Sequence, residues 1–154
     1  MKEHTKAFTA TLLFIGLVFL RSGFEKISEG QFVNSLGKIL TGIALKNPYP
    51  WYKDFLYNVA IPNSKSFATL TMYGEFLAGL SITVSCLYLL FSKTKNQVAI
   101  YVLILGLIGG LFLNLNFWLG FGYTSPATDS LNLLMFFIEL IGTITLFRFL
   151  RGEK

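Results

Sequence analysis

The sequence predicts an all-α integral membrane protein: a bundle of four transmembrane helices with an amphipathic interfacial cap between the first and second. The first observation is composition. Of 154 residues, 53% are hydrophobic and only 14% are charged, which is too apolar for the surface of a soluble domain. The second is the presence of four apolar runs, each of about 20 residues or more, the length that a bilayer crossing requires. We expect a single transmembrane domain over residues 1–154, with spans at about residues 7–27, 66–91, 97–119 and 126–149.

Two of these runs begin with helix-capping residues. Ser125 precedes Pro126 at the start of the fourth run; serine is a favoured N-cap, and proline is tolerated in the first helical turn. Asn63 or Ser64 can cap the second run just after Pro62. These signals place the start of both helices to within a few residues.

The stretch between the first two runs, about residues 30–62, predicts the interfacial cap. Its first half has apolar residues at helical spacing opposite polar ones: Phe32, Leu36, Ile39, Leu40 and Ile43. Asn47 and Pro48 end this helix. Pro50 begins a second short helix, in which one side carries Trp51, Phe55, Leu56 and Val59. We expect both segments to lie on one mouth of the bundle, with Trp51 at the level of the lipid headgroups.

Basic residues predict the orientation of the chain. The loop at residues 120–130, on one side of the membrane, has no Lys or Arg. The other side is expected to carry Lys2, Lys6, Lys93, Lys95, Arg148, Arg151 and Lys154. The cap carries lysines too, but interfacial helices keep lysines on their wet face. Because cytoplasmic loops are enriched in Lys and Arg, we expect both termini to be cytoplasmic.

Several classes of function are excluded by the residue types present. The net charge is +5, but the lysines form no basic stripe with interleaved aromatics, so we expect no nucleic-acid partner. Cys86 is the only cysteine and His4 the only histidine. A disulfide, a CxxC redox pair and a thiolate metal cluster within the chain are therefore excluded, and we expect no metal, haem or flavin.

Polar residues of the four spans fall at one level of the membrane. Because successive spans cross the membrane in opposite directions, the polar residues expected in the outer half of the membrane are Arg21, Glu25, Tyr73, Glu75, Asn114, Asn116, Trp118, Asp129 and Asn132. Glu139 lies two turns beyond Asn132 and nearest the midplane. Since each charge in a span costs at least about 2.5 kcal/mol on insertion scales, we expect these groups to form a polar pocket beneath the cap.

Each polar group has a functional and a structural interpretation. Arg21 is the natural counter-ion for Glu75 or Glu25, and can otherwise grip an oxyanion. For Glu75 and Glu139 we favour a functional role. For the three amides, interhelical hydrogen bonding is as plausible as ligand contact: Asn114, Asn116 and Asn132. Trp51 and Trp118 suit interface anchors better than stacking groups for a quinone ring.

Three short stretches, together with the four-span layout, resemble the DoxX/DoxD family, in particular the DoxD-like membrane subunits of thiosulfate:quinone oxidoreductases. The stretches are Phe19-Leu20-Arg21-Ser22-Gly23-Phe24-Glu25-Lys26, then Asn47-Pro48-Tyr49-Pro50-Trp51 with Phe55-Leu56, and Tyr73-Gly74-Glu75-Phe76-Leu77-Ala78-Gly79-Leu80. The resemblance implies oxidation of thiosulfate to tetrathionate with a membrane quinone as acceptor and co-substrate. It also implies a second small subunit and a prokaryotic cytoplasmic membrane.

The resemblance suggests roles for the candidate residues. Arg21 and Lys26 would attract the small anionic sulfur substrate, and Glu75 and Glu139 would deliver protons as the quinone is reduced. The alternative hypothesis is a non-catalytic scaffold or accessory subunit of a larger complex, whose polar pocket locks the helices or holds a lipid. A small transporter is less favoured, because the chain has no inverted repeat and no pair of broken helices.

Overall fold

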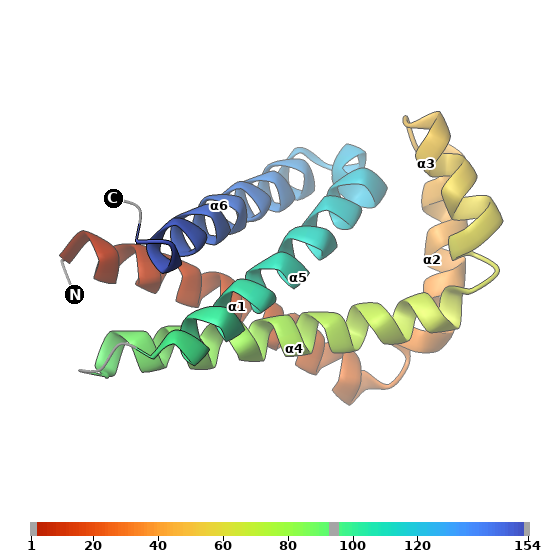
Figure 1. The fold of residues 1–154 in the computed structure, drawn as a ribbon. Coiled ribbons are helices and arrows are strands. Elements are labelled where there is room, and N and C mark those ends of the chain that lie inside the picture. Colours follow the sequence, from red (N-terminus) through yellow and green to blue (C-terminus); the bar gives the residue numbers. More distant parts are fainter. Residues whose placement is uncertain (1–2, 93–95, 153–154) are drawn as a thin grey trace.

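The computed structural model describes residues 3–92 and 96–152, and this part of the chain is helical without any strand. Four long helices form the bundle: α1 (Glu3–Glu29), α4 (Ser64–Phe91), α5 (Gln97–Phe121) and α6 (Pro126–Leu150) (Figure 1). Each is long and apolar enough to cross a membrane. The prediction of an all-α four-span bundle is confirmed, and the spans begin and end within a few residues of the expected positions.

Helices α1 and α4 pack against each other in antiparallel fashion with their backbones in close contact. A Cβ added to Gly23 would lie 2.5 Å from the backbone nitrogen of Phe76, and one on Gly16 would lie 2.8 Å from the Thr83 hydroxyl. Small residues allow such close approach in membrane bundles. Around this contact lies the main hydrophobic core, which includes Leu12, Ile15, Phe19, Ile82, Leu103 and Leu107.

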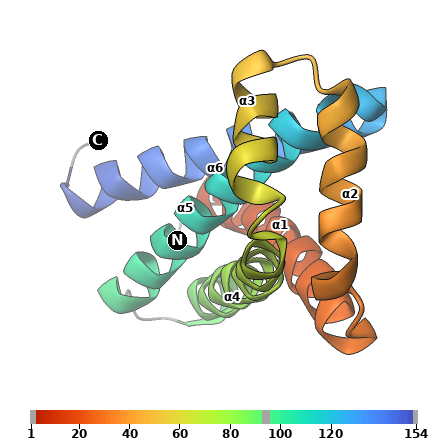
Figure 2. The same cartoon turned by 90° about the vertical axis from the view of Figure 1, so that its right-hand side faces the viewer.

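The cap consists of two segments that run beside each other across one end of the bundle (Figure 2). They are α2 (Phe32–Lys46) and α3 (Pro50–Phe55), the latter continued by the π-helical turn η1 (Leu56–Ala60). Helix α2 buries Leu36, Leu40, Ile43 and Ala44. The prediction of two cap helices separated at Asn47-Pro48 is therefore confirmed.

The residues that α3 and η1 bury are not the set that the sequence pattern placed on one side of this segment. The buried residues are Tyr52, Leu56 and Ala60, whereas Trp51 is 61% exposed and Val59 also faces outward. The hydroxyl of Tyr52 donates to the backbone oxygen of Asn116 at 3.2 Å. Helix α3 therefore has Tyr52 on its inner side and Trp51 on its outer side.

Hydrogen bonds fasten the cap to the end of α5 and to the 3-10 turn η2 (Gly122–Thr124) that follows it. The Asn47 amide donates to the carbonyl of Leu119 at 2.9 Å. The Tyr123 hydroxyl donates to the carbonyl of Ile43 at 2.7 Å. Because backbone carbonyls near a helix end need partners, these bonds hold the cap in place over the bundle.

Helices α6 and α4 both begin where expected, but only α6 has a side-chain cap. Ser125 Oγ accepts a hydrogen bond from the Thr128 amide at 3.1 Å, and Pro126 follows as the first helical residue. Asn63 precedes α4, yet its side chain donates to the Val59 carbonyl at 2.9 Å. Of the two predicted cap residues, Asn63 or Ser64, Asn63 therefore occupies the N-cap position but makes no side-chain capping hydrogen bond, because its amide bonds to the preceding turn instead.

Both ends of the described chain lie at the end of the bundle opposite the cap (Figure 1). This arrangement follows from an even number of crossings. Of the basic residues that predicted the orientation, Lys2, Lys93, Lys95 and Lys154 lie outside the described residues. The four apolar helices identify a multi-pass membrane protein.

Candidate functional site: a pocket beneath the cap

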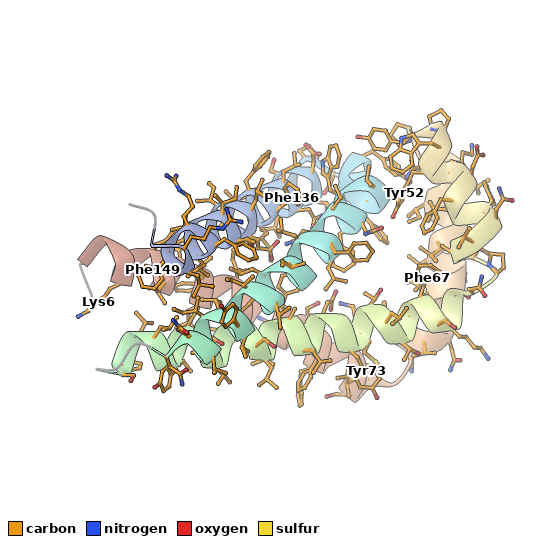
Figure 3. The ribbon with its side chains drawn as sticks, in the orientation of Figure 1. Lys6, Tyr52, Phe67, Tyr73, Phe136 and Phe149 are labelled. Atoms are coloured by element: carbon orange, nitrogen blue, oxygen red, sulfur yellow. The ribbon has the colours of Figure 1, made fainter. Side chains whose placement is uncertain are left out.

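A cavity of about 820 Å³ lies beneath the cap, with walls formed mainly by α4 and α5. Tyr52 of α3 and Phe67 of α4 both line it and point into the space between cap and bundle (Figure 3), whereas Tyr73 lies on the outer side of α4. Most of the lining is apolar. The polar lining residues are Ser22, Lys26, Tyr52, Thr71, Glu75, Asn116, Thr124, Thr128 and Asn132.

An ion pair forms part of the pocket wall. Lys26 Nζ lies 2.6 Å from Glu75 Oε2 and also donates to Ser22 Oγ at 2.7 Å. The Glu75 side chain is only 2% exposed. The Phe32 ring centre lies 5.4 Å from the same ammonium group. A buried carboxylate needs a partner of this kind, so the two charges neutralise each other inside the wall.

The local sequence explains how the two residues meet. Ser22 and Lys26 are one helical turn apart and lie on the face of α1 that also carries Phe19. This face packs on α4, where Gly23 meets Phe76 backbone to backbone. The close crossing leaves Lys26 beside Glu75, the neighbour of Phe76.

The structure does not bring Arg21 into the pocket. Its Nε pairs with Glu25 Oε1 at 2.8 Å, and the Arg21 side chain is 82% exposed. We expected Arg21 to pair with Glu75 or Glu25. It pairs with Glu25, and Glu75 pairs with Lys26. The reason is helical phase: Arg21 shares its face of α1 with Phe14 and Leu17, which are exposed.

A second polar group lies in the interior of the bundle and does not line the pocket. Glu139 of α6 is fully buried, and its Oε2 accepts a hydrogen bond from the Asn114 amide at 2.9 Å. Its Oε1 has no hydrogen-bond partner among the residues that the structure describes. The expected single pocket is thus divided into a cap-side cavity with Lys26 and Glu75, and a separate buried pair.

The remaining predicted residues are bound mainly to neighbouring groups. Asn116 lines the pocket and donates to the Phe112 carbonyl at 2.7 Å. Asn132 also lines it and donates to the Thr128 carbonyl at 2.9 Å. Trp118 Nε1 donates to Asp129 at 2.7 Å. The predicted site residues that do not line the pocket are Arg21, Asn114, Glu139, Trp51 and Trp118.

Tyr52 lines the pocket but was not among the predicted site residues. Burial raises the pKa of Tyr52 to about 12, so its hydroxyl remains a hydrogen-bond donor at neutral pH. Besides the Asn116 backbone, it contacts Asn116 Oδ1 at 3.3 Å. The spacing of Tyr52, Leu56 and Ala60, one on each successive turn, is the sequence pattern that would have indicated an inward side chain.

The pocket suits an amphiphilic ligand. Ligand sites of this size combine apolar walls with a few placed polar groups, as here. Within residues 3–92 and 96–152, no three His, Cys, Asp or Glu side chains lie close enough to hold a metal ion. Comparisons of the chain with family models, curated proteins and solved structures gave no match. The resemblance to the DoxX/DoxD family therefore stays a prediction that rests on the motifs.

Proposed function

We propose that this chain is the membrane subunit of a quinone-linked oxidoreductase and that the pocket beneath the cap is its quinone site. The observation that supports this most is the Lys26–Glu75 pair, 2.6 Å apart, in the wall of an otherwise apolar cavity of about 820 Å³. A quinone has the matching chemistry: a ring with two hydrogen-bond-accepting oxygens, and an apolar tail. The resemblance to the DoxX/DoxD family adds thiosulfate as the electron donor.

Three pocket residues take roles in the proposed reaction. Lys26, the ammonium of the pair, donates a hydrogen bond to a carbonyl oxygen of the ring and transfers a proton to it as electrons arrive, and Glu75, the carboxylate of the pair, accepts the replacement proton and returns it to Lys26. Tyr52, whose hydroxyl donates to Asn116, holds the cap over the site. Arg21, which was expected to grip the sulfur anion, faces away from the pocket and has no role in it. Glu139, which does not line the cavity, is held by Asn114 and has no direct role here.

The reaction balances as two half-reactions. Two thiosulfate ions lose two electrons and join through a new sulfur–sulfur bond to give tetrathionate. The quinone takes up two electrons and two protons to give the quinol. Lys26 is already neutralised by Glu75, so the dianionic sulfur substrate binds outside the pocket. We propose that thiosulfate binds at the second small subunit and at the exposed lysines of the cap, Lys38 and Lys46.

For localisation, we propose the prokaryotic cytoplasmic membrane, with both termini in the cytoplasm and the pocket in the outer half of the bilayer. The support is the placement of Lys6 and of Arg148 and Arg151 at the end of the bundle where both termini lie. The positive-inside rule assigns such an end to the cytoplasm.

The experiment that tests this function is thiosulfate-dependent reduction of decylubiquinone by the protein purified with its native membrane partners. Glu75→Gln and Lys26→Met should each lower the rate by about 10²-fold or more, the range for loss of a positioned acid or base. Lys65→Met is the matched control, since Lys65 is exposed and does not line the pocket. Full activity in Glu75→Gln would refute the proposed role of the pair.

A second candidate function is a non-catalytic accessory subunit. It is favoured by the way many polar groups of the spans satisfy one another, as in Asn114 with Glu139 and Trp118 with Asp129. Under this hypothesis Glu75→Gln lowers the melting temperature or the recovery of partner subunits and leaves the turnover of the recovered complex unchanged. The same set of variants therefore separates the two functions.

A further inference from the structure

Helices α4 and α5 make close contact near the middle of the bundle and diverge toward the cap (Figure 1). A Cβ added to Gly106 of α5 would lie 3.2 Å from the Ala78 carbonyl of α4. One turn closer to the cap, a Cβ on Gly109 would lie 3.7 Å from Ala78 Cβ, an ordinary van der Waals distance. A Cβ on Gly74 would likewise lie 3.7 Å from Leu113. The pocket occupies the space between the diverging ends.

The edge of this space is apolar and exposed. Leu70 of α4 and Phe112 of α5 both line the pocket, and each is 69% exposed. Thr71, Gly74 and Gly109 line it at the same level. All five lie in the membrane-spanning segments, so a bilayer surrounds this edge. A charged, water-soluble molecule would have to leave water to reach it, whereas a membrane-dissolved molecule would not.

The opposite end of the pocket is covered. The cap is bonded to α5 through Tyr52 and Asn47, and α2 touches α4 where Gly37 meets Ser64, so closely that an added Cβ would lie 2.9 Å from the serine oxygen. Cap side chains including Leu36, Leu40 and Leu56 form the roof of the cavity. An aqueous path would have to displace this layer.

From this geometry we infer that the ligand loads sideways from the bilayer, between α4 and α5, and leaves its apolar tail in the gap between Leu70 and Phe112. Its polar head lies at Lys26 and Glu75. The ligand class is a membrane-dissolved amphiphile with a neutral, oxygen-bearing head, because the charge of Lys26 is already neutralised. This inference rests on the proposed quinone site and adds the route and the orientation of the bound molecule.

The first arm of the test uses cysteine protection in vesicles. Thr71→Cys places a thiol at the edge of the gap, and Thr69→Cys is its matched control, exposed on the same helix but outside the pocket lining. The native Cys86 is buried and contributes little background. With decylubiquinone at about ten times its Kd, modification of Thr71→Cys by N-ethylmaleimide should slow about tenfold, and Thr69→Cys should be unaffected.

The second arm separates head from tail. A quinone without a tail should bind, as shown by a rise in the melting temperature of the protein, but should leave Thr71→Cys open to modification. If both quinones bind and neither protects Thr71→Cys, the sideways route is wrong and the quinone site stands. If neither quinone binds, the proposed function fails together with the inference.

The third arm narrows the gap. Gly109→Leu adds a side chain at the edge, and Gly42→Leu is its control, because a Cβ there meets nothing within 4 Å. Gly109→Leu should slow association of decylubiquinone by about tenfold, since binding that requires a conformational change is slower. Equal association rates in Gly109→Leu and Gly42→Leu would overturn the inference.

Discussion

Gly110 of α5 faces the carboxyl group of Glu139 on α6 so closely that an added Cβ would overlap Glu139 Oε1. The same carboxyl group is bonded to Asn114 one turn further along α5. Glycine at this position thus makes room for a buried polar pair that joins α5 to α6. The pair supports the bundle beside the pocket, and the pocket remains free for a ligand.

This relationship predicts a coupled effect on stability. Gly110→Ala should lower the free energy of unfolding by about 1–3 kcal/mol, because overpacking forces side chains or backbone to shift. In a Glu139→Ala background the same change should cost much less. A double-mutant cycle of melting temperatures in detergent measures the coupling. If the effects of the two changes were additive, the contact with Glu139 would not be what limits the size of the side chain at position 110.

The contact between α1 and α4 predicts a contrast between glycines. Gly23→Ala should destabilise the bundle, since the new Cβ would lie 2.5 Å from the Phe76 backbone nitrogen, which cannot move independently. Gly42→Ala, in α2 with nothing within 4 Å, should stabilise by about 0.5–1 kcal/mol through helix propensity. Thermal unfolding of both variants tests this contrast. A loss of stability in Gly42→Ala would contradict the open space around position 42.

The Lys26–Glu75 pair predicts that two changes are less harmful than one. Glu75→Leu leaves the Lys26 ammonium in the pocket wall without its partner, and breaking a buried pair costs about 3–5 kcal/mol. Replacing both, as Lys26→Met with Glu75→Leu, should recover most of that stability while abolishing quinone reduction. Arg21→Met is the control for loss of a basic side chain from α1, and should change stability little because Arg21 is exposed. A double variant no more stable than Glu75→Leu would argue against a direct pair.

Tyr52 predicts a pH dependence of cap attachment. Its pKa is raised from the ordinary 10 to about 12 by burial, so the folded protein favours the neutral hydroxyl. The contribution of Tyr52 to stability should therefore be complete below pH 10 and be lost as the pH rises from 10 toward 12. Tyr52→Phe removes the titrating group and should flatten the melting temperature over this range. If the melting temperature of Tyr52→Phe fell with pH as steeply as that of the unmodified protein, the pH dependence would have to come from other groups.

The sequence was sufficient for the architecture, because four apolar runs and two proline-bounded segments each have a physical length requirement. It was sufficient for the position of each polar residue along its helix but not for its direction around the helix. Arg21 and Lys26 lie near the same end of α1, yet only Lys26 falls on the face of Phe19 and Leu12, which lie seven and fourteen residues before it. Applying that helical phase would have assigned Lys26 to the interior and Arg21 to the lipid-facing side.

Other features depend on tertiary contacts that no local pattern contains. The division of the polar groups into a pocket and a buried pair follows from how α5 and α6 pack, with Glu139 filling the space beside Gly110. The pocket lies where α4 and α5 diverge beneath the cap (Figure 1), and this arrangement is likewise a matter of packing between distant segments.

The most direct test of the central claim is photo-cross-linking with an azido-quinone that carries an apolar tail, followed by mass spectrometry of the labelled peptides. If the pocket beneath the cap is a quinone site, adducts should fall on lining residues of α4 and α5, such as Phe67, Leu70 and Phe112. Excess decylubiquinone should compete them away, and the Lys26→Met variant should reduce them. Adducts confined to lipid-facing residues outside the pocket, or unaffected by competitor, would contradict the claim.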